Sequence, residues 1–158
     1  MNTVLLRVLA VVLSGVSLEP LEEKVVPFNA MPAECAAVYD AELKRFRQAT
    51  ETEVITSDLD GDKVPELLIF NGENGSGGEG WVVMRKDNGK YRKAGDVFGI
   101  LYKSGNDLIV ESPCGWAEAT WSYYTIEHGK SVCKFEITVK YSKPIRQAPK
   151  EIIVKILK

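Results

Sequence analysis

The stretch V-C-K-F-E-I-T-V-K-Y at residues 132–141 decides the fold, because its apolar and polar side chains alternate strictly. Successive side chains of a β-strand point to opposite faces of the sheet. The pattern therefore predicts a strand with one face in the core and the other in water. The apolar face carries Cys133, Phe135, Ile137, Val139 and Tyr141, and the polar face carries Lys134, Glu136, Thr138 and Lys140.

Short segments with the same two-residue period fill much of the chain after residue 50. No segment alternates a strand with a long helix, so parallel βαβ units are not expected. Turn residues that accept positive φ separate the segments at Asp87-Asn88-Gly89, Ser104-Gly105-Asn106 and His128-Gly129. We therefore expect an antiparallel meander whose other strands lie at 53–56, 66–70, 81–86, 91–94, 99–103, 107–111, 119–127 and 152–157.

A helix is expected upstream of these strands, beginning near Met31 or Pro32, because proline is tolerated in a first helical turn. The residues that follow have the spacing of one apolar helix face, at Cys35, Val38, Tyr39, Leu43 and Phe46. The predicted fold class is α+β, with one N-terminal amphipathic helix packed on an antiparallel β-meander.

The N-terminal residues 1–17 read M-N-T-V-L-L-R-V-L-A-V-V-L-S-G-V-S. One positive charge at Arg7, a short apolar run and small residues at Gly15 and Ser17 are typical of a secretory signal peptide. The apolar run is too short to span a bilayer. A buried N-terminal strand is the alternative. We expect a signal peptide at 1–17, an extended leader at 18–30 and one domain at 31–158. The protein would then be periplasmic or secreted, with no membrane insertion after signal removal.

Charge and cysteine content limit the classes of partner and cofactor. The chain has 20 Lys and Arg against 22 Asp and Glu, so no overall positive field favours nucleic acid as a partner. One histidine and three cysteines, without CxxC or HxxxH spacing, argue against zinc. Cys35, Cys114 and Cys133 allow one disulfide in an exported protein, and the alternative is that all three are small buried apolar residues.

The acidic stretch D-L-D-G-D-K-V-P-E at residues 58–66 is the strongest chemical signal in the chain. Its carboxylates stand at loop positions one, three, five and nine, and they repel one another unless a cation neutralises them. Calcium suits such a loop because it takes six to eight oxygen ligands in a flexible geometry. The expected ligands are Asp58, Asp60, Asp62 and Glu66, the Val64 carbonyl and water. The alternative is a solvated acidic turn.

Residues 58–70, which continue the acidic loop into L-L-I-F, resemble the calcium loop and following strand of FG-GAP and VCBS-type repeats. The pattern is also related to EF-hand and dockerin loops. The resemblance implies calcium ligation by Asp58, Asp60, Asp62 and Glu66, with Val64 contributing through its backbone. Position six is usually glycine in those loops and is Lys63 here, and strands replace the flanking helix of an EF-hand. The loop occurs once, and a single copy cannot make a propeller.

Two other segments are candidates for contact with a partner. Residues 71–80 hold five glycines and predict an exposed hairpin loop, which either probes a partner's cleft or is a tolerated surface loop. An aromatic group lies at 116–124, and in a strand its side chains would occupy both faces. They form either an aromatic core or an exposed binding surface. The candidate contact residues are Asn74, Gly75, Ser76, Glu79, Trp116, Trp121 and Tyr124.

Catalytic machinery is not expected. His128 is the only histidine and lies in a predicted turn, and no G-x-S-x-G motif occurs. Glu73 and Glu79 lie on the glycine-rich loop, which positions an acid and base poorly. We expect a non-catalytic, exported, calcium-stabilised bacterial protein that binds and inhibits a partner protein, such as an immunity or inhibitor protein against a secreted cell-wall hydrolase. The alternatives are a carbohydrate or cell-surface adhesion module and, less favoured, a carboxylate-dependent glycan hydrolase.

Overall fold

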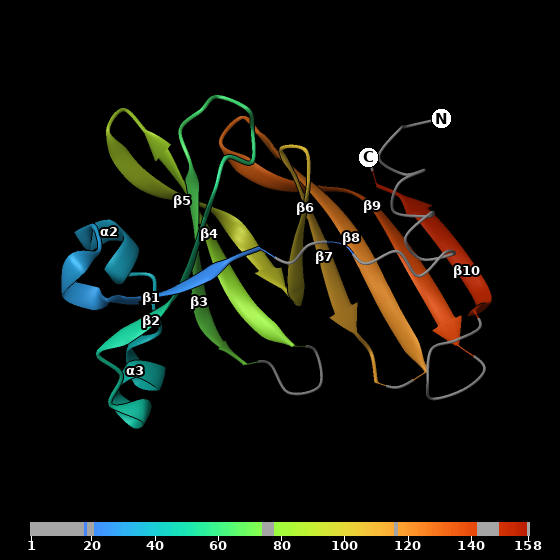
Figure 1. Ribbon diagram of the computed structural model, residues 1–158, viewed down its shortest axis with the longest axis horizontal. Coiled ribbons are helices and arrows are strands. Elements are labelled where there is room, and N and C mark those ends of the chain that lie inside the picture. The colour runs from blue at the N-terminus through green and yellow to red at the C-terminus, as the bar shows by residue number, and fades with distance from the viewer. Residues whose placement is uncertain (1–17, 19–20, 74–77, 116, 142–148, 158) are drawn as a thin grey trace.

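Two five-stranded antiparallel sheets make up the protein, and they pack face to face as a β-sandwich (Figure 1). The computed structural model describes residue 18 and residues 21–73, 78–115, 117–141 and 149–157. In each sheet neighbouring strands are consecutive in the chain, in the orders β1-β2-β3-β4-β5 and β10-β9-β8-β7-β6. The predicted signal peptide at 1–17 lies outside the described residues.

The bounds of the strands follow the alternating pattern closely. The first sheet contains β1 (Glu23–Pro27), β2 (Glu51–Ser57), β3 (Glu66–Glu73), β4 (Glu79–Asp87) and β5 (Lys90–Phe98). The second contains β6 (Ile100–Ser104), β7 (Asp107–Pro113), β8 (Glu118–Glu127), β9 (Lys130–Tyr141) and β10 (Pro149–Ile156). Every strand expected from the sequence overlaps one of these, and residues 23–27 of the expected leader form the additional strand β1 at the edge of the first sheet.

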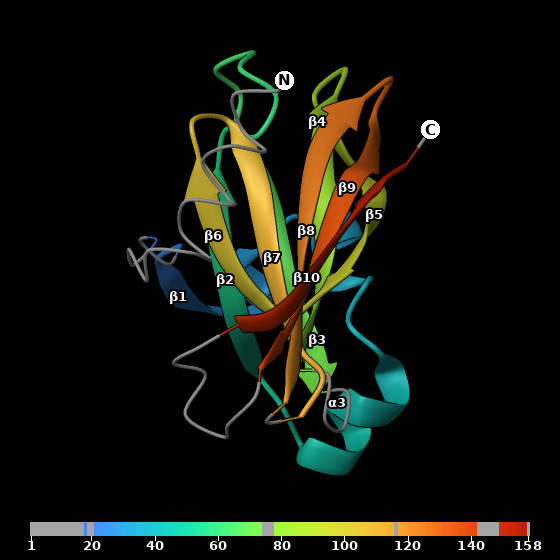
Figure 2. The ribbon, with the colours of Figure 1, turned by 90° about the vertical axis from the view of Figure 1, so that its right-hand side faces the viewer.

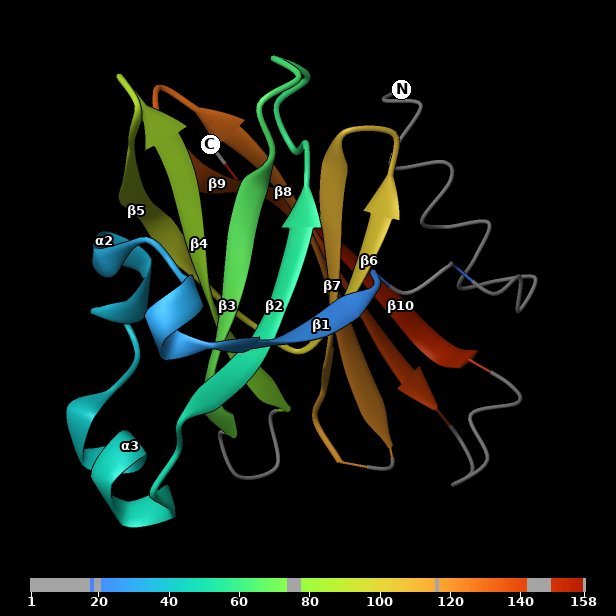
Figure 3. The ribbon, with the colours of Figure 1, turned by 60° about the vertical axis from the view of Figure 1, so that its left-hand side comes forward.

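The predicted α+β class is wrong, because strands make up 63% of the described residues and helices only 11%. In place of one long helix, the structure has a 3-10 turn, η1 (Phe28–Ala30), and two short helices, α2 (Ala33–Ala36) and α3 (Ala41–Arg47) (Figure 3). Asp40 separates the helices. Its carboxylate accepts a hydrogen bond from the Leu43 N–H at 2.7 Å, and its own N–H donates to the Asn71 side chain at 2.9 Å. An N-cap residue has a non-helical backbone, so the expected helix breaks here.

The main core lies between the two sheets. It combines residues from both layers, and each is nearly or fully shielded from solvent. The first sheet and the loop after β2 contribute Ile55, Leu59, Leu68, Phe70, Trp81, Val83, Ala94 and Val97, and the second contributes Leu101, Leu108 and Val110. The packing of these two apolar faces explains why ten short strands form one unit.

Both sheets also bury apolar side chains on the faces that point away from this core. On the first sheet, Cys35 of α2 packs against Val54, Ile69, Val82 and Met84, so the helical segment covers that face. On the second sheet, the residues of β7, β8 and β9 form a separate apolar cluster. We call it the outer cluster, and it consists of Ile109, Trp121, Tyr123, Phe135, Ile137 and Val139.

All three cysteines are free, so the structure does not contain the disulfide that the cysteine count allows. Cys35 is fully buried, Cys114 is exposed and Cys133 is half-buried. Burial, together with the nearby charge of Glu34, raises the pKa of the Cys35 thiol to about 11. This thiol is therefore protonated at neutral pH and behaves as a small apolar core residue. Among the described residues, no helix has the length and apolar character needed to cross a membrane.

The chain passes from the first sheet to the second at Gly99, between β5 and β6. Gly99 has φ +141°, and a Cβ at this position would lie 2.2 Å from the Glu111 carbonyl oxygen. Its N–H donates to the Glu79 carbonyl at 2.8 Å. The backbone of β7 approaches residue 99 so closely that only glycine fits here.

Candidate metal centre

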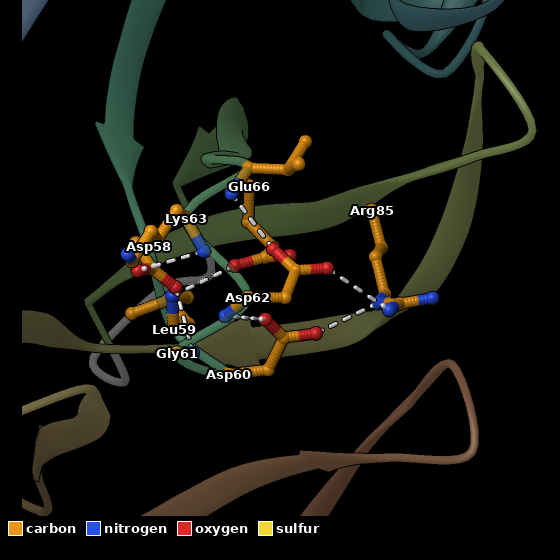
Figure 4. A network of polar contacts seen from close by, with 9 residues as sticks. Asp58, Leu59, Asp60, Gly61, Asp62, Lys63, Glu66 and Arg85 are labelled. Atoms are coloured by element: carbon orange, nitrogen blue, oxygen red, sulfur yellow. Dashed lines mark hydrogen bonds and ion pairs between the residues drawn. The ribbon is translucent and has the colours of Figure 1, made fainter.

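The acidic loop joins β2 to β3 and is ordered by its own carboxylates (Figure 4). Asp58 accepts hydrogen bonds from the Gly61 N–H at 2.7 Å and the Lys63 N–H at 3.3 Å. Asp60 accepts from the Asp62 N–H at 3.1 Å, and Asp62 accepts from the Val64 N–H at 2.7 Å. Aspartate favours such local bonds to the backbone that follows it, so the sequence itself folds this loop.

Three of the four predicted carboxylate ligands converge. One carboxylate oxygen from each of Asp58, Asp60 and Glu66 lies within 4.8 Å of the others. Asp58 and Asp60 are half-buried, and Glu66 is only 1% exposed. Converging carboxylate oxygens are the donor set that calcium prefers, and backbone carbonyls and water could complete its six to eight ligands.

Glu66 is the buried member of this group. Its carboxylate accepts a hydrogen bond from the Leu59 N–H at 2.7 Å. Burial raises the pKa of Glu66 to about 7, and the charges of Asp60 and Asp62 also act to raise it. An adjacent cation would favour the ionised form and offset both effects. One buried and two half-buried acids therefore converge here, and a divalent cation could offset their repulsion.

Arg85 of β4 contacts the same loop and was missed by the sequence analysis. Its Nε donates to Asp60 at 2.9 Å, and its Nη2 lies 3.3 Å from an oxygen of Asp62. The register that pairs Leu67 with Met84 places Arg85 beside Glu66, and no local sequence signal reveals that register. Although burial opposes the effect, the hydrogen bond from Arg85 helps to hold the pKa of Asp60 below its usual range. Asp62 thus faces Arg85 rather than joining the three converging carboxylates.

Lys63 occupies the loop position that is usually glycine in the similar calcium loops, and its φ is +68°. The turn therefore requires the left-handed backbone at this position, as the sequence comparison implied. For a non-glycine residue, this conformation lowers the free energy of unfolding by about 1–2 kcal/mol. Lys63 thus adopts this backbone at some cost in stability.

Replacing Lys63 with glycine is expected to raise the free energy of unfolding by up to about 1 kcal/mol, because relief of the left-handed strain exceeds the extra entropy of the unfolded chain. Lys63→Ala is the matched control, since it removes the same charge and keeps the Cβ. Urea unfolding of both variants measures the difference. Equal stabilities of the two variants would show that the backbone at residue 63 carries no strain.

The other predicted contact residues are not gathered at this loop. Glu79 begins β4 and pairs in register with Glu73 of β3. Trp121 is 9% exposed within the outer cluster, and Tyr124 is half-buried against the main core. Val64 is 38% exposed in the acidic loop. Four of the predicted contact residues lie outside the described part of the chain, namely Asn74, Gly75, Ser76 and Trp116.

A cleft of about 450 Å³ lies beside the acidic loop. Asp60 and Arg85 line it together with residues of the β4–β5 and β8–β9 hairpins, including Arg92, His128 and Lys130. His128 lies in the turn between β8 and β9 with φ +50°, as its sequence context predicts. The acidic loop therefore borders an open, charged surface.

No family model, no curated protein and no solved structure matches this chain. The likeness of residues 58–70 to FG-GAP and VCBS-type loops therefore stays a prediction, and the case for a metal centre depends on the geometry described above.

Proposed function

We propose that the protein is an exported, non-catalytic binding protein that is stabilised by calcium and that binds and inhibits a partner protein. The observation that carries the calcium part is the convergence of Asp58, Asp60 and the buried Glu66. Calcium-binding modules outside the cell have dissociation constants of about 10⁻⁴–10⁻³ M, so a site of modest affinity would be filled there.

The position of the loop explains how an ion would stabilise the fold. The loop connects β2 to β3, and Arg85 links it to β4. An ion held by Asp58, Asp60 and Glu66 would fix the ends of these neighbouring strands and reduce the repulsion among the acids. Its role would be structural, since ligands that bind only the folded state raise the free energy of unfolding.

Calcium at about 5 mM is expected to raise the free energy of unfolding by about 1–2 kcal/mol relative to chelator. Asp58→Asn should abolish most of this gain, because it removes one of the converging carboxylates. Glu51→Gln is the matched control, since it removes an exposed acid of β2 outside the loop. Thermal unfolding and calorimetric titration with calcium and with magnesium measure the effect. A wild-type protein that melts identically in calcium and in chelator would reduce the loop to an acidic turn.

The inhibitor part rests on features of the sequence, namely the predicted export signal and the glycine-rich segment 71–80 between β3 and β4. Its test is a turbidity assay of peptidoglycan digestion with a panel of cell-wall hydrolases, including any encoded beside this gene. Stoichiometric inhibition of one hydrolase in calcium is expected. Full activity of every hydrolase in the presence of excess protein would contradict the inhibitor role and leave the calcium result standing.

Neither alternative function gains support from the described residues. A carbohydrate module usually presents an open aromatic surface, whereas Trp121 is buried and Tyr124 packs against the main core. For a glycan hydrolase, the structure adds only the register pairing of Glu73 with Glu79 at the β3–β4 hairpin. We therefore argue no second function.

A further inference from the structure

β10 is the edge strand of the second sheet (Figure 2), and among the described strands β9 is its one neighbour. The N–H of Leu157, just past the end of β10, donates to the Lys134 carbonyl of β9 at 2.9 Å. In an antiparallel pair, residues whose N–H and C=O groups bond the partner strand alternate with residues whose groups point away from it. The backbone groups of Ile152, Val154 and Ile156 therefore point away from β9, because the register is regular from residue 151 onward. The outer edge of β10 can thus pair with an added strand.

β10 also exposes apolar side chains on both of its faces. Ile153 is 43% exposed, and Val154, which follows it on the opposite face, is 41% exposed. Ile156 is 74% exposed. An exposed apolar edge strand is a template for pairing with another chain, and proteins usually shorten, twist or cover such an edge. These features favour an added strand at β10.

We propose that the added strand is β10 of a second copy of this chain, in antiparallel pairing about a two-fold axis that passes through Ile153. Residues equally far from the axis lie opposite one another in such a pair. Glu151 then lies opposite Lys155 of the second copy, and Ile152 lies opposite its Val154. The pairing would join the second sheet of one copy to the second sheet of the other.

Charge favours a second copy as the occupant. Within one copy, Nζ of Lys140 lies 2.9 Å from a carboxylate oxygen of Glu151, and Nζ of Lys155 lies 3.9 Å from one of Glu136. Pairing would bring Glu151 of each copy beside Lys155 of the other, so the charges would alternate in sign across all four strands. Opposite charges on facing strands stabilise the pair. A lysine on an edge strand usually opposes strand addition, but here the facing glutamate would neutralise it.

The apolar residues fit the same register. Ile152 pairs with Val139 of β9 and packs against the outer cluster. Val154 lies on the same face and pairs with Ile137 of that cluster. With Ile152 of each copy opposite Val154 of the other, this apolar face would continue from one sheet into the next. On the opposite face, the exposed Ile153 side chains would cover each other.

Other positions of the axis fit less well. A shift by one residue places Ile153 opposite Glu151 or Lys155, and a shift by two places one of these charged residues opposite its own copy. Like charges that lie directly opposite one another destabilise a strand pair. The axis at Ile153 is therefore the position at which both the charged and the apolar residues match.

The inference depends on neither the calcium site nor the inhibitor role. β10 contributes only a few residues to the pairing, and interfaces this small are typical of weak or transient complexes. We therefore expect a dimer whose population rises with protein concentration. Sedimentation of the full-length chain between about 10 µM and 1 mM should show it. A chain that stays monomeric throughout this range would overturn the proposal.

Reversal of one charge tests the occupant and the register together. Glu151→Lys and Lys155→Glu should each raise the dissociation constant of the dimer about tenfold or more, because each places like charges opposite one another on both sides of the axis. An equimolar mixture of the two variants should dimerise again, since a mixed pair restores opposite charges at both places. Arg92→Glu is the control, because Arg92 pairs with Asp87 on the first sheet, and it should leave the dissociation constant unchanged. Dimers that persist in each variant alone, or a mixture of folded variants that stays monomeric, would overturn the proposal.

Disulfide formation decides the question if a charge variant does not fold. In a Cys114→Ser background, which removes the exposed native thiol, Ile153→Cys should give a disulfide-linked dimer under mild oxidation. Facing residues that do not exchange hydrogen bonds have Cα atoms about 4.5 Å apart, within reach of a disulfide. Ile156→Cys is the control, because residue 156 is more exposed and yet its two copies would lie about 20 Å apart. Equal yields from the two variants, or no dimer from Ile153→Cys, would overturn the proposal.

Discussion

Replacing Gly99 with alanine is expected to lower the free energy of unfolding by about 3 kcal/mol or more. The added Cβ would lie 2.2 Å from the Glu111 carbonyl oxygen and 2.9 Å from a methyl of Val110. The carbonyl belongs to the backbone of β7, so it can move only if the pairing of Ile100 with Glu111 is disturbed. The φ of +141° adds strain, because residues other than glycine rarely adopt this backbone conformation.

Gly105→Ala is the matched control for this prediction. Gly105 also has a positive φ, +65°, and a Cβ there would meet no atom within 4 Å. Its replacement should therefore lower the free energy of unfolding by only about 1–2 kcal/mol, because the left-handed backbone is strained for alanine. Urea unfolding followed by circular dichroism measures both variants. Similar losses for the two would show that the junction between the sheets adjusts to a side chain at residue 99.

Gly99 also shows why the fold class was predicted wrongly. Alternation of side chains is a local property, and it located the strands on both sides of this residue. Division of those strands into two layers depends on contacts between residues distant in the chain, such as the packing of Trp81 with Leu108 and Val110 in the main core. The sequence marks this junction with a single glycine, and a lone glycine does not distinguish a change of sheet from a bend within one strand.

The prediction of a single helix was wrong for a related reason. The spacing from Cys35 to Phe46 fits one apolar helix face, but Asp40 caps a new helix and is held by Asn71 of β3. Phe46 is consequently 87% exposed, although the pattern placed it on the buried side. The apolar spacing of the sequence thus predicted the buried residues correctly as far as Tyr39. Beyond that residue, the long-range hydrogen bond between Asp40 and Asn71 determines the structure instead.

The acidic loop was easier to predict, because nearly all its order is local. The bonds from Asp58, Asp60 and Asp62 reach backbone groups only a few residues along the chain. The burial of Glu66 and its contact with Leu59 also lie within the motif. Arg85 could not be foreseen, because its place beside the loop depends on the register of β3 against β4.

In a calcium chelator, the protein is expected to lose stability as the pH rises from about 4.5 to about 7 because of Glu66. The ordinary carboxyl pKa of 4.5 applies to the unfolded chain, and burial raises the pKa in the folded protein to about 7. Between these values the folded state binds more protons than the unfolded state, so the slope of unfolding free energy against pH is negative. The full effect of this one group is at most about 3 kcal/mol.

Glu66→Gln isolates this contribution, because glutamine keeps an oxygen for the Leu59 N–H and does not titrate. The stability difference between variant and wild type in chelator should grow in favour of the variant as the pH rises through this window. Calcium should reverse the order by stabilising the wild type alone, since the variant lacks the buried carboxylate ligand. Urea unfolding across the pH range, with and without calcium, measures both effects. If the stability difference between variant and wild type in chelator does not change with pH, burial does not raise the pKa of Glu66. The carboxylate would then be ionised in the folded protein even without calcium.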